Sequence, residues 1–598
     1  MDRRRFLAAG ASAPLAVGAK ASAPARDRTL RVAFPSPETG FDPAQVQDMY
    51  SSQIISHVFD APLRYDYMAR PARLVPNTTV GLPEVSSDFR TFTLRIRPGI
   101  WFQDDPAFKG RRRELIAEDY VYSIKRVFDP RWKSQMLFEL EPAKIEGIDD
   151  LRQRALKGRP FDYSTAIEGL RALDRYTLQI RLAAPAPRFV STLALAVPAG
   201  AVAREVVEMY GDQIMEHPVG TGPFRLAQWK RTSRIVLERN PTYRDETWDF
   251  ETPADLPALA PDVARLRGRK VPLLDRVEVT IIEESQPRWL SFDQGALDQL
   301  AVPFDYVPLA APNRELAPHL ARRGVRLQAT ALPDITLSYF NMDHPLVGGY
   351  APEKVALRRA VSLAFDSGRY IREIYRGSAT AAQSPFVPGT FGYDPTLRTE
   401  LSEYSPARAK ALLDIFGYVD RNGDGWREQP DGSPLLLEMA SATSQLERRQ
   451  NEHWQRCMDA VGLKMEFRVA QWPELLKQSL AGKLMMWGFA WQSGSADSDL
   501  FFSLAYGANL GSSNDARFAL KAYDALYAQQ HSLPDGPERL ALLREATRLL
   551  VAYMPYKFIA HRIQLDLTQP WVLGFRRPLF TTRLWAYMDV DTDVRGSA

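Results

Sequence analysis

Cysteine is nearly absent from this sequence, and the short motifs of several common enzyme classes are missing. The 598 residues include a single cysteine, Cys457, and seven histidines, of which no two stand four residues apart. One thiol excludes an internal disulfide and any metal cluster built from cysteines. The chain also lacks the His-Glu-x-x-His, Gly-x-Ser-x-Gly and Gly-x-x-x-x-Gly-Lys motifs. These patterns give no support to a metalloprotease, a serine hydrolase or a P-loop nucleotide enzyme.

Long apolar runs are missing as well. After the N-terminal region no run is long enough to cross a bilayer. The composition, 45% hydrophobic and 25% charged, is that of a globular protein. Because the chain is several times longer than a typical single domain, we expect two or three lobes.

The first residues carry a targeting signal. The segment RRRFL at 3–7 fits the twin-arginine export pattern, and a short apolar segment follows at 8–19. Small residues just before Ser22 predict cleavage there, and loss of 1–21 removes a net charge of +3 from the total of +4. The basic charge therefore belongs to the signal and does not indicate a nucleic-acid partner. We expect a soluble periplasmic protein without a lipid anchor, since no cysteine stands at the predicted mature N-terminus.

Strands and helices alternate along the chain, which predicts a mixed α/β fold. Period-two alternation marks strands, and apolar residues at i, i+3 and i+7 mark helices. Cys457 lies in a helical pattern, where we expect it to be buried. The predicted strands cover 28–34, 89–97 and 177–183, and the predicted helices cover 117–129, two stretches of 355–377 separated near Asp366, and 537–555.

The stretch HPVGTGPF at 217–224 poses a choice between a phosphate-binding loop and a structural turn. A phosphate-binding glycine loop needs a helix N-terminus after it, whose free N–H groups meet the anion. Here Pro223 removes one N–H donor, and the segments 224–230 and 234–240 read as two strands of a hairpin. The stretch is therefore predicted to be a turn that enters a hairpin.

The same residues carry a family resemblance. The run VGTGPF at 219–224, with a hairpin that ends in LERNPTY, resembles the signature region of the dipeptide/oligopeptide-type substrate-binding proteins of ABC importers, solute-binding protein family 5, cluster C. Four matching segments stand in the right order and the similarity extends from Thr29 to Val590. The other matching segments are 92–105 with 117–127, 339–389 and 549–562.

The resemblance implies a periplasmic-binding-protein-like type II venus flytrap, with two ligand-closing lobes plus an extra inserted domain. It implies binding without catalysis. A monomer captures a small ligand, with an oligopeptide or dipeptide as the favoured class, and delivers it to an inner-membrane ABC permease. An exported hydrolase is the alternative outside this class. The implied lobe I covers 28–61, 191–331 and 560–598, the inserted domain II covers 62–190, and lobe III covers 332–559.

The ligand site implied by the resemblance lies near the run MMWGFAWQSG. Trp487, Phe489 and Trp491 share one side of an extended segment, and Trp491 is the one expected to face the ligand. Peptide-binding members resemble one another at a Trp-x-x-Asp whose carboxylate pairs with the ligand's α-ammonium, but this chain has Gly494 at the aspartate position. The predicted ligand-binding residues are Trp487, Trp491, Gln492, Ser493, Asp497, Tyr506 and Asn509.

Two explanations of the missing aspartate stay open. In one, Asp497 or Asp499 replaces it, because a buried ammonium without a counter-charge is costly. In the other, the ligand has no free N-terminus at this place and is a modified or cell-wall peptide, a sugar, an opine or a metal chelate.

One loop resembles a calcium site. Asp420, Asn422, Asp424 and Gly425 fit the first half of a calcium-binding loop, and Glu428 stands at its ninth position. The twelfth position is Asp431 and not the usual glutamate. A strand pattern follows in place of a second helix. We therefore expect a helix-to-strand turn and no cofactor, with calcium as the less favoured alternative.

Overall fold

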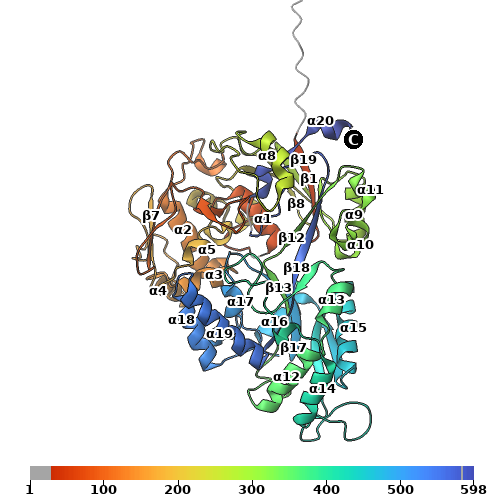
Figure 1. Ribbon diagram of the computed structural model, residues 1–598. Coiled ribbons are helices and arrows are strands. Elements are labelled where there is room, and N and C mark those ends of the chain that lie inside the picture. The colour runs from red at the N-terminus through yellow and green to blue at the C-terminus, as the bar shows by residue number, and fades with distance from the viewer. Residues whose placement is uncertain (1–27, 47, 581–582, 598) are drawn as a thin grey trace, which may run out of the picture.

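Three sheets organise the part of the chain that the structure describes, residues 28–46, 48–580 and 583–597 of a computed structural model (Figure 1). Two four-stranded sheets lie in the upper half of Figure 1, and the eight-stranded sheet extends from the upper half into the lower half. We call residues 28–331 with 563–597 the upper lobe, and residues 334–560 the lower lobe. No helix in the described ranges is long and apolar enough to cross a membrane.

The first sheet has the order β1-β10-β9-β8, in which β1 runs parallel to β10 and the other pairs are antiparallel. The hairpin predicted after the glycine stretch is confirmed as β8 and β9. The strands are β1 (Thr29–Phe34), β8 (Phe224–Lys230), β9 (Arg234–Arg239) and β10 (Arg276–Ile281).

The glycines before this hairpin allow two backbones to approach closely. A Cβ added to Gly220 would lie 1.9 Å from the carbonyl oxygen of Val58, and one added to Gly222 would lie 2.5 Å from that of His57. The N–H of Gly222 donates to the Val58 carbonyl at 2.9 Å. The glycine pattern thus serves backbone packing, as a structural turn requires.

The second four-stranded sheet, β4-β5-β7-β6, stands at the left of Figure 1 with the buried helix α2 (Ala117–Phe128) against it. The predicted alternation in β5 is confirmed, because Phe92 and Leu94 are buried. One hydrophobic core joins this sheet to the first. The strands are β4 (Glu84–Val85), β5 (Thr91–Arg95), β6 (Leu170–Ala172) and β7 (Thr177–Arg181), and β2 (Leu63–Tyr65) pairs with β3 (Leu74–Pro76) nearby.

Short helices complete the upper lobe. They are α1 (Met49–Val58), α3 (Leu137–Leu140), α4 (Ile148–Leu156), α5 (Phe189–Thr192), α6 (Ala196–Ala199), α7 (Arg204–Tyr210), α8 (Ala260–Leu266), α9 (Ser285–Asp293), α10 (Val307–Ala310), α11 (Pro318–Ala321) and α20 (Thr592–Ser597).

The lower lobe has its own hydrophobic core around the strand order β13-β17-β15-β16. The predicted break near Asp366 is confirmed, because its side chain accepts a hydrogen bond from the N–H of Arg369 and starts α13. Cys457 is buried in α15, as expected. The strands are β13 (Asp334–Phe340), β14 (Ala379–Ala381), β15 (Leu436–Ala442), β16 (Lys464–Ala470) and β17 (Met486–Gln492), and the helices are α12 (Pro352–Ala364), α13 (Ser367–Glu373), α14 (Pro406–Ile415), α15 (Gln445–Asp459), α16 (Trp472–Leu480), α17 (Asp499–Ser503), α18 (Lys521–His531) and α19 (Pro537–Tyr553).

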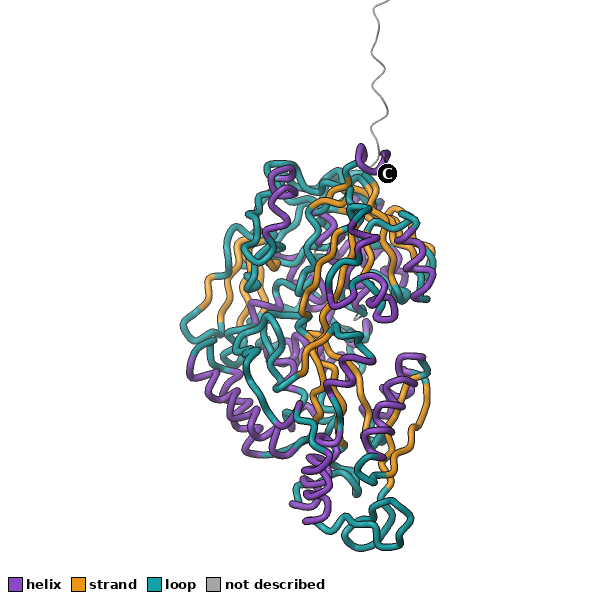
Figure 2. The backbone as a smooth tube through the Cα atoms, turned by 45° about the vertical axis from the view of Figure 1, so that its right-hand side comes forward, coloured by secondary structure: helices purple, strands orange, loops and turns teal. Residues whose placement is uncertain are grey.

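One long strand belongs to both lobes. Strand β18 (Tyr556–Thr568) pairs with β13 through Tyr556–Ala560 and with β12 (Arg326–Ala331) through Ile563–Thr568. Strand β11 (Gln299–Ala301) also pairs with the second half of β18. Farther along the chain, β19 (Val572–Leu573) pairs with β20 (Asp589–Val590). The chain crosses a second time at 332–333, between β12 and β13. Figure 2 shows strands running between the two halves at this place.

A buried ion pair ties the two crossings together. Asp334, fully buried, accepts hydrogen bonds from the backbone N–H and the Nε of Arg562, at 2.9 and 2.5 Å. Burial raises the pKa of Asp334, and Arg562 limits that rise. Burial lowers the pKa of His561 to about 4, so its neutral ring donates from Nδ1 to the Asp334 carbonyl at 2.6 Å. These contacts fix β18 against the first residue of the lower lobe.

Replacing Arg562 with glutamine should lower the free energy of unfolding by about 3 kcal/mol, because it leaves the Asp334 carboxylate buried without its cation. Adding Asp334→Asn to that variant should recover roughly half of the loss, since the unpaired charge is then gone. Urea unfolding measures both values. A single variant as stable as the wild type would show that this pair does not hold the crossing.

Candidate functional site

The end of strand β17 lies where the chain passes between the lobes. In the antiparallel register with β13, Trp491 is opposite Ile335 and Gln492 is opposite Asp334. The N–H of Ser493 donates to the carbonyl of Pro333 at 2.8 Å, within the crossing segment. Residues 491–494 therefore leave the lower sheet at the junction of the lobes, the place where a two-lobed binding protein encloses its solute.

An aromatic row leads to this junction, and its last member has a buried polar group without a partner among the described residues. The ring of Trp487 is 1% exposed and packs between Trp472 and Phe489, with ring centroids 4.8 and 4.9 Å away. Trp491 lies beyond Phe489, and its buried Nε1 has no hydrogen-bond partner among the described residues. A buried, unpaired N–H costs about 1–3 kcal/mol, and Trp491 carries this unsatisfied donor at the junction of the lobes. Trp487 packs in the core and leaves little surface for contact with a solute.

Position 494 faces open space. A Cβ added to Gly494 would meet no atom within 4 Å, and the backbone conformation there tolerates a side chain. Gln492 is also exposed. Ser493 is buried, and its hydroxyl donates to the carbonyls of Ser495 and Asp497 at 2.8 and 3.0 Å. Of the predicted residues here, Gln492 is accessible to a solute, whereas Ser493 shapes the loop.

Asp497 is held in the lower lobe by an arginine. Arg539, 1% exposed, donates from both terminal nitrogens to the Asp497 carboxylate, at 2.7 and 2.9 Å. The N–H of Asp499 also donates to this carboxylate at 2.7 Å. Two parallel charge-assisted hydrogen bonds form the strong geometry for such a pair. Using Asp497 to bind an ammonium would require breaking them.

The carboxylate of Asp499, like that of Asp497, already has several partners. It accepts hydrogen bonds from Tyr527 at 2.9 Å and Gln530 at 2.7 Å, and His531 lies 3.4 Å away. Burial acts to raise the pKa of Asp499, but the contacts with His531 and Arg188 outweigh it and hold the pKa well below its ordinary range. Replacement of the missing aspartate by either acid stays a prediction, and these contacts disfavour it.

Tyr506 and Asn509 follow α17, close to the same junction. The half-buried ring of Tyr506 packs on Tyr527, with centroids 4.6 Å apart, and the amide of Asn509 donates to the carbonyl of Ser503 at 2.9 Å. The buried Asn514 amide donates to the carbonyls of Tyr506 and Phe518. Tyr506 and Asn509 stay candidates for contact with a solute.

Sequence patterns gave no sign of the residues that reach this loop from the upper lobe. The hydroxyl of Tyr65 accepts a hydrogen bond from the N–H of Ala496 at 3.1 Å, and Arg188 lies between Asp497 and Asp499, at 3.7 and 3.8 Å. Burial and the charge of Asp499 raise the pKa of Glu139 to about 7. These contacts join residues more than 300 positions apart, for which local periodicity carries no signal.

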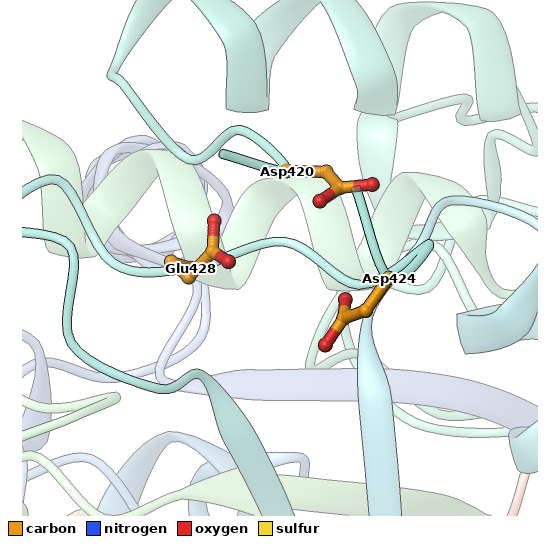
Figure 3. A group of neighbouring side chains, drawn as sticks. All are labelled: Asp420, Asp424 and Glu428. Atoms are coloured by element: carbon orange, nitrogen blue, oxygen red, sulfur yellow. The ribbon is translucent and has the colours of Figure 1, made fainter. Parts of the chain in front are cut away.

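The calcium-like loop has its acidic groups close together. The carboxylates of Asp420, Asp424 and Glu428 lie within 4.8 Å of one another on one loop (Figure 3). Asp420 accepts hydrogen bonds from the N–H groups of Gly423 and Gly425, at 2.7 and 2.9 Å, and the other two acids each accept one backbone N–H. The predicted strand after the loop is confirmed as β15. Acids that cap their own loop are typical of a turn.

Comparisons with known proteins agree on one class. A family profile described as bacterial extracellular solute-binding proteins, family 5, matches residues 73–513. The di/tripeptide-binding protein 2 of Pseudomonas aeruginosa is 26% identical, with 96% of this chain and 98% of that protein covered. The heme-binding protein A of Haemophilus influenzae is 23% identical, with 82% and 80% covered.

Solved structures share the fold. The periplasmic binding protein DppA of Helicobacter pylori in complex with the peptide STSA superposes with a TM-score of 0.73 at 20% identity, with 94% of this chain and 98% of that chain covered. The murein tripeptide binding protein MppA of Escherichia coli gives 0.70 at 19% identity, with 95% and 99% covered. The predicted periplasmic-binding-protein fold is confirmed. Since family 5 proteins carry ligands without transforming them, the hydrolase alternative is set aside. The chain belongs to the bacterial extracellular solute-binding proteins of family 5.

Proposed function

We propose that this protein is the periplasmic substrate-binding component of an ABC importer, and that it captures a dipeptide or oligopeptide between its lobes. The observation that carries the proposal is the end of β17, where the unpaired Nε1 of Trp491 and the open space at Gly494 lie beside the crossing segments. Relatives named for di- and tripeptides support the peptide class. Closure around the crossings would bury the solute and present a closed shape to an inner-membrane permease.

A second solute class has its own support. Gly494 provides no carboxylate for an α-ammonium, and the two nearby acids already bind other residues. A relative is named as a heme-binding protein. The alternative is therefore the same carrier with a non-peptide solute: a metal chelate, a sugar or an opine.

Native mass spectrometry of the protein isolated from periplasm tests the proposal. Binding proteins of this kind can retain their solute through purification, because closure slows release. We expect adducts whose masses and fragments are those of short peptides. Adducts of non-peptide mass alone would contradict the peptide proposal and support the second class.

Replacing Gly494 with aspartate should strengthen binding of a peptide with a free N-terminus, such as trialanine, by about tenfold, because the carboxylate would enter open space and pair with the ammonium. The matched control is Gly81→Asp, which adds the same charge at another glycine with no atom within 4 Å. Isothermal titration calorimetry measures both affinities. Equal affinities for the two variants would show that position 494 does not face the peptide's N-terminus.

We also propose that residues 3–7 direct twin-arginine export, that cleavage before Ser22 releases the mature chain, and that it acts as a monomer without a lipid anchor. The sequence pattern supports the signal. These positions lie outside the described residues. N-terminal sequencing of the periplasmic protein tests the cleavage site.

For the loop at 420–431 we propose a structural turn and no cofactor. Its acids accept hydrogen bonds from their own backbone, and Asp431 replaces the closing glutamate. Millimolar calcium should change the melting temperature by no more than about 1 °C, because a site without affinity gives no stabilisation. A larger increase that a chelator reverses would establish a calcium site.

A further inference from the structure

An arginine of the upper lobe reaches into the loop that carries Gly494. We call residues 493–499 the ligand loop. Arg188, which follows β7 and immediately precedes α5, donates to the carbonyl oxygens of Leu533 and His531 at 2.9 and 2.8 Å. Its nitrogens also lie 3.7 Å from Asp497 and 3.8 Å from Asp499. One side chain thus holds two acids of the ligand loop and the end of α18.

These contacts cross between two separate cores. Arg188 belongs to the lobe whose core includes the neighbouring Phe189, whereas α17 and α18 pack on the core of the lower lobe. Any rotation of the lower lobe about the crossings would pull its carbonyls and carboxylates away from Arg188. The pair of Asp497 with Arg539 lies entirely in the lower lobe and would move as one unit.

Among the described residues, a second ion pair between the lobes is weaker. Arg449 and Asp305 join α15 to the upper lobe at 2.8 Å, but their side chains are 27% and 43% exposed. Water and salt screen such a pair, and its net contribution is small. Arg188 is 16% exposed, and it binds two backbone carbonyls besides the acids. Of these two contacts, Arg188 is the one that can hold the lobes together.

We propose that Arg188 is a positioning residue that fastens the ligand loop to the upper lobe and so keeps the lobes closed around a solute. The claim that Arg188 keeps the lobes closed around a solute rests on the proposed function, whereas the claim that it joins the lobes does not. Because the loop it holds also carries Gly494 and follows Trp491, Arg188 couples the shape of the solute site to the closed arrangement. Its effect should appear mainly in the rate of solute release.

The test compares Arg188→Gln with the wild type by small-angle X-ray scattering of the protein as isolated. We expect a larger radius of gyration for the variant, an intermediate value for Arg188→Lys, which keeps the charge but not the fork of donors, and melting temperatures within about 2 °C of the wild type. The matched control is Arg175→Gln, whose partner Glu114 lies in the same lobe. Scattering of Arg188→Gln that equals the wild type would overturn the proposal.

A kinetic experiment separates this proposal from the proposed function. Where trialanine binds the wild type, its dissociation from Arg188→Gln, followed by tryptophan fluorescence, should be about tenfold faster with a nearly unchanged association rate. Equal dissociation rates would contradict the role of Arg188. If trialanine does not bind the wild type, the peptide proposal is weakened, and the scattering comparison still decides the role of Arg188.

Discussion

Strand β18 is the constraint on which the arrangement depends, because one continuous strand pairs with strands of both lobes. Its first half pairs with β13 and its second half with β12. A strand cannot belong to two sheets unless those sheets meet at its middle, and the buried pair of Asp334 and Arg562 lies at that point. The lobes are therefore joined along this strand.

The position of the proposed solute site follows from strand register. Strand β17 is antiparallel to β13, and β13 begins at the crossing, so β17 must end there. The loop that leaves β17 is consequently delivered to the junction of the lobes without any further element to guide it. Trp487 and Trp491 lie on the same face of β17, because alternate residues of a strand point to one side. Trp487 lies within the strand and is buried in the core, whereas Trp491 lies near the end of the strand, at the crossing.

Local patterns were enough to predict several of the elements. The hairpin after Pro223, the alternation of β5 and the break at Asp366 each depend on residues a few positions apart. Family resemblance added Trp491 and Gly494. The partners of Asp334, Asp497 and Asp499 could not be predicted, because an acid in a sequence rich in arginine has many candidate partners, and only the tertiary fold selects one.

Both acids of the ligand loop already have charged partners within the protein. Arg539 and Arg188 neutralise Asp497, while His531 and Arg188 surround Asp499. The positions left accessible or unpaired are Gln492, Gly494 and the Nε1 of Trp491, none of which carries a charge. In the proposed site these groups would orient a solute by neutral hydrogen bonds and aromatic surface, without an ion pair to hold it. Retention would have to come from enclosure, so the contacts that keep the lobes together matter more here than in a carrier whose loop has the aspartate.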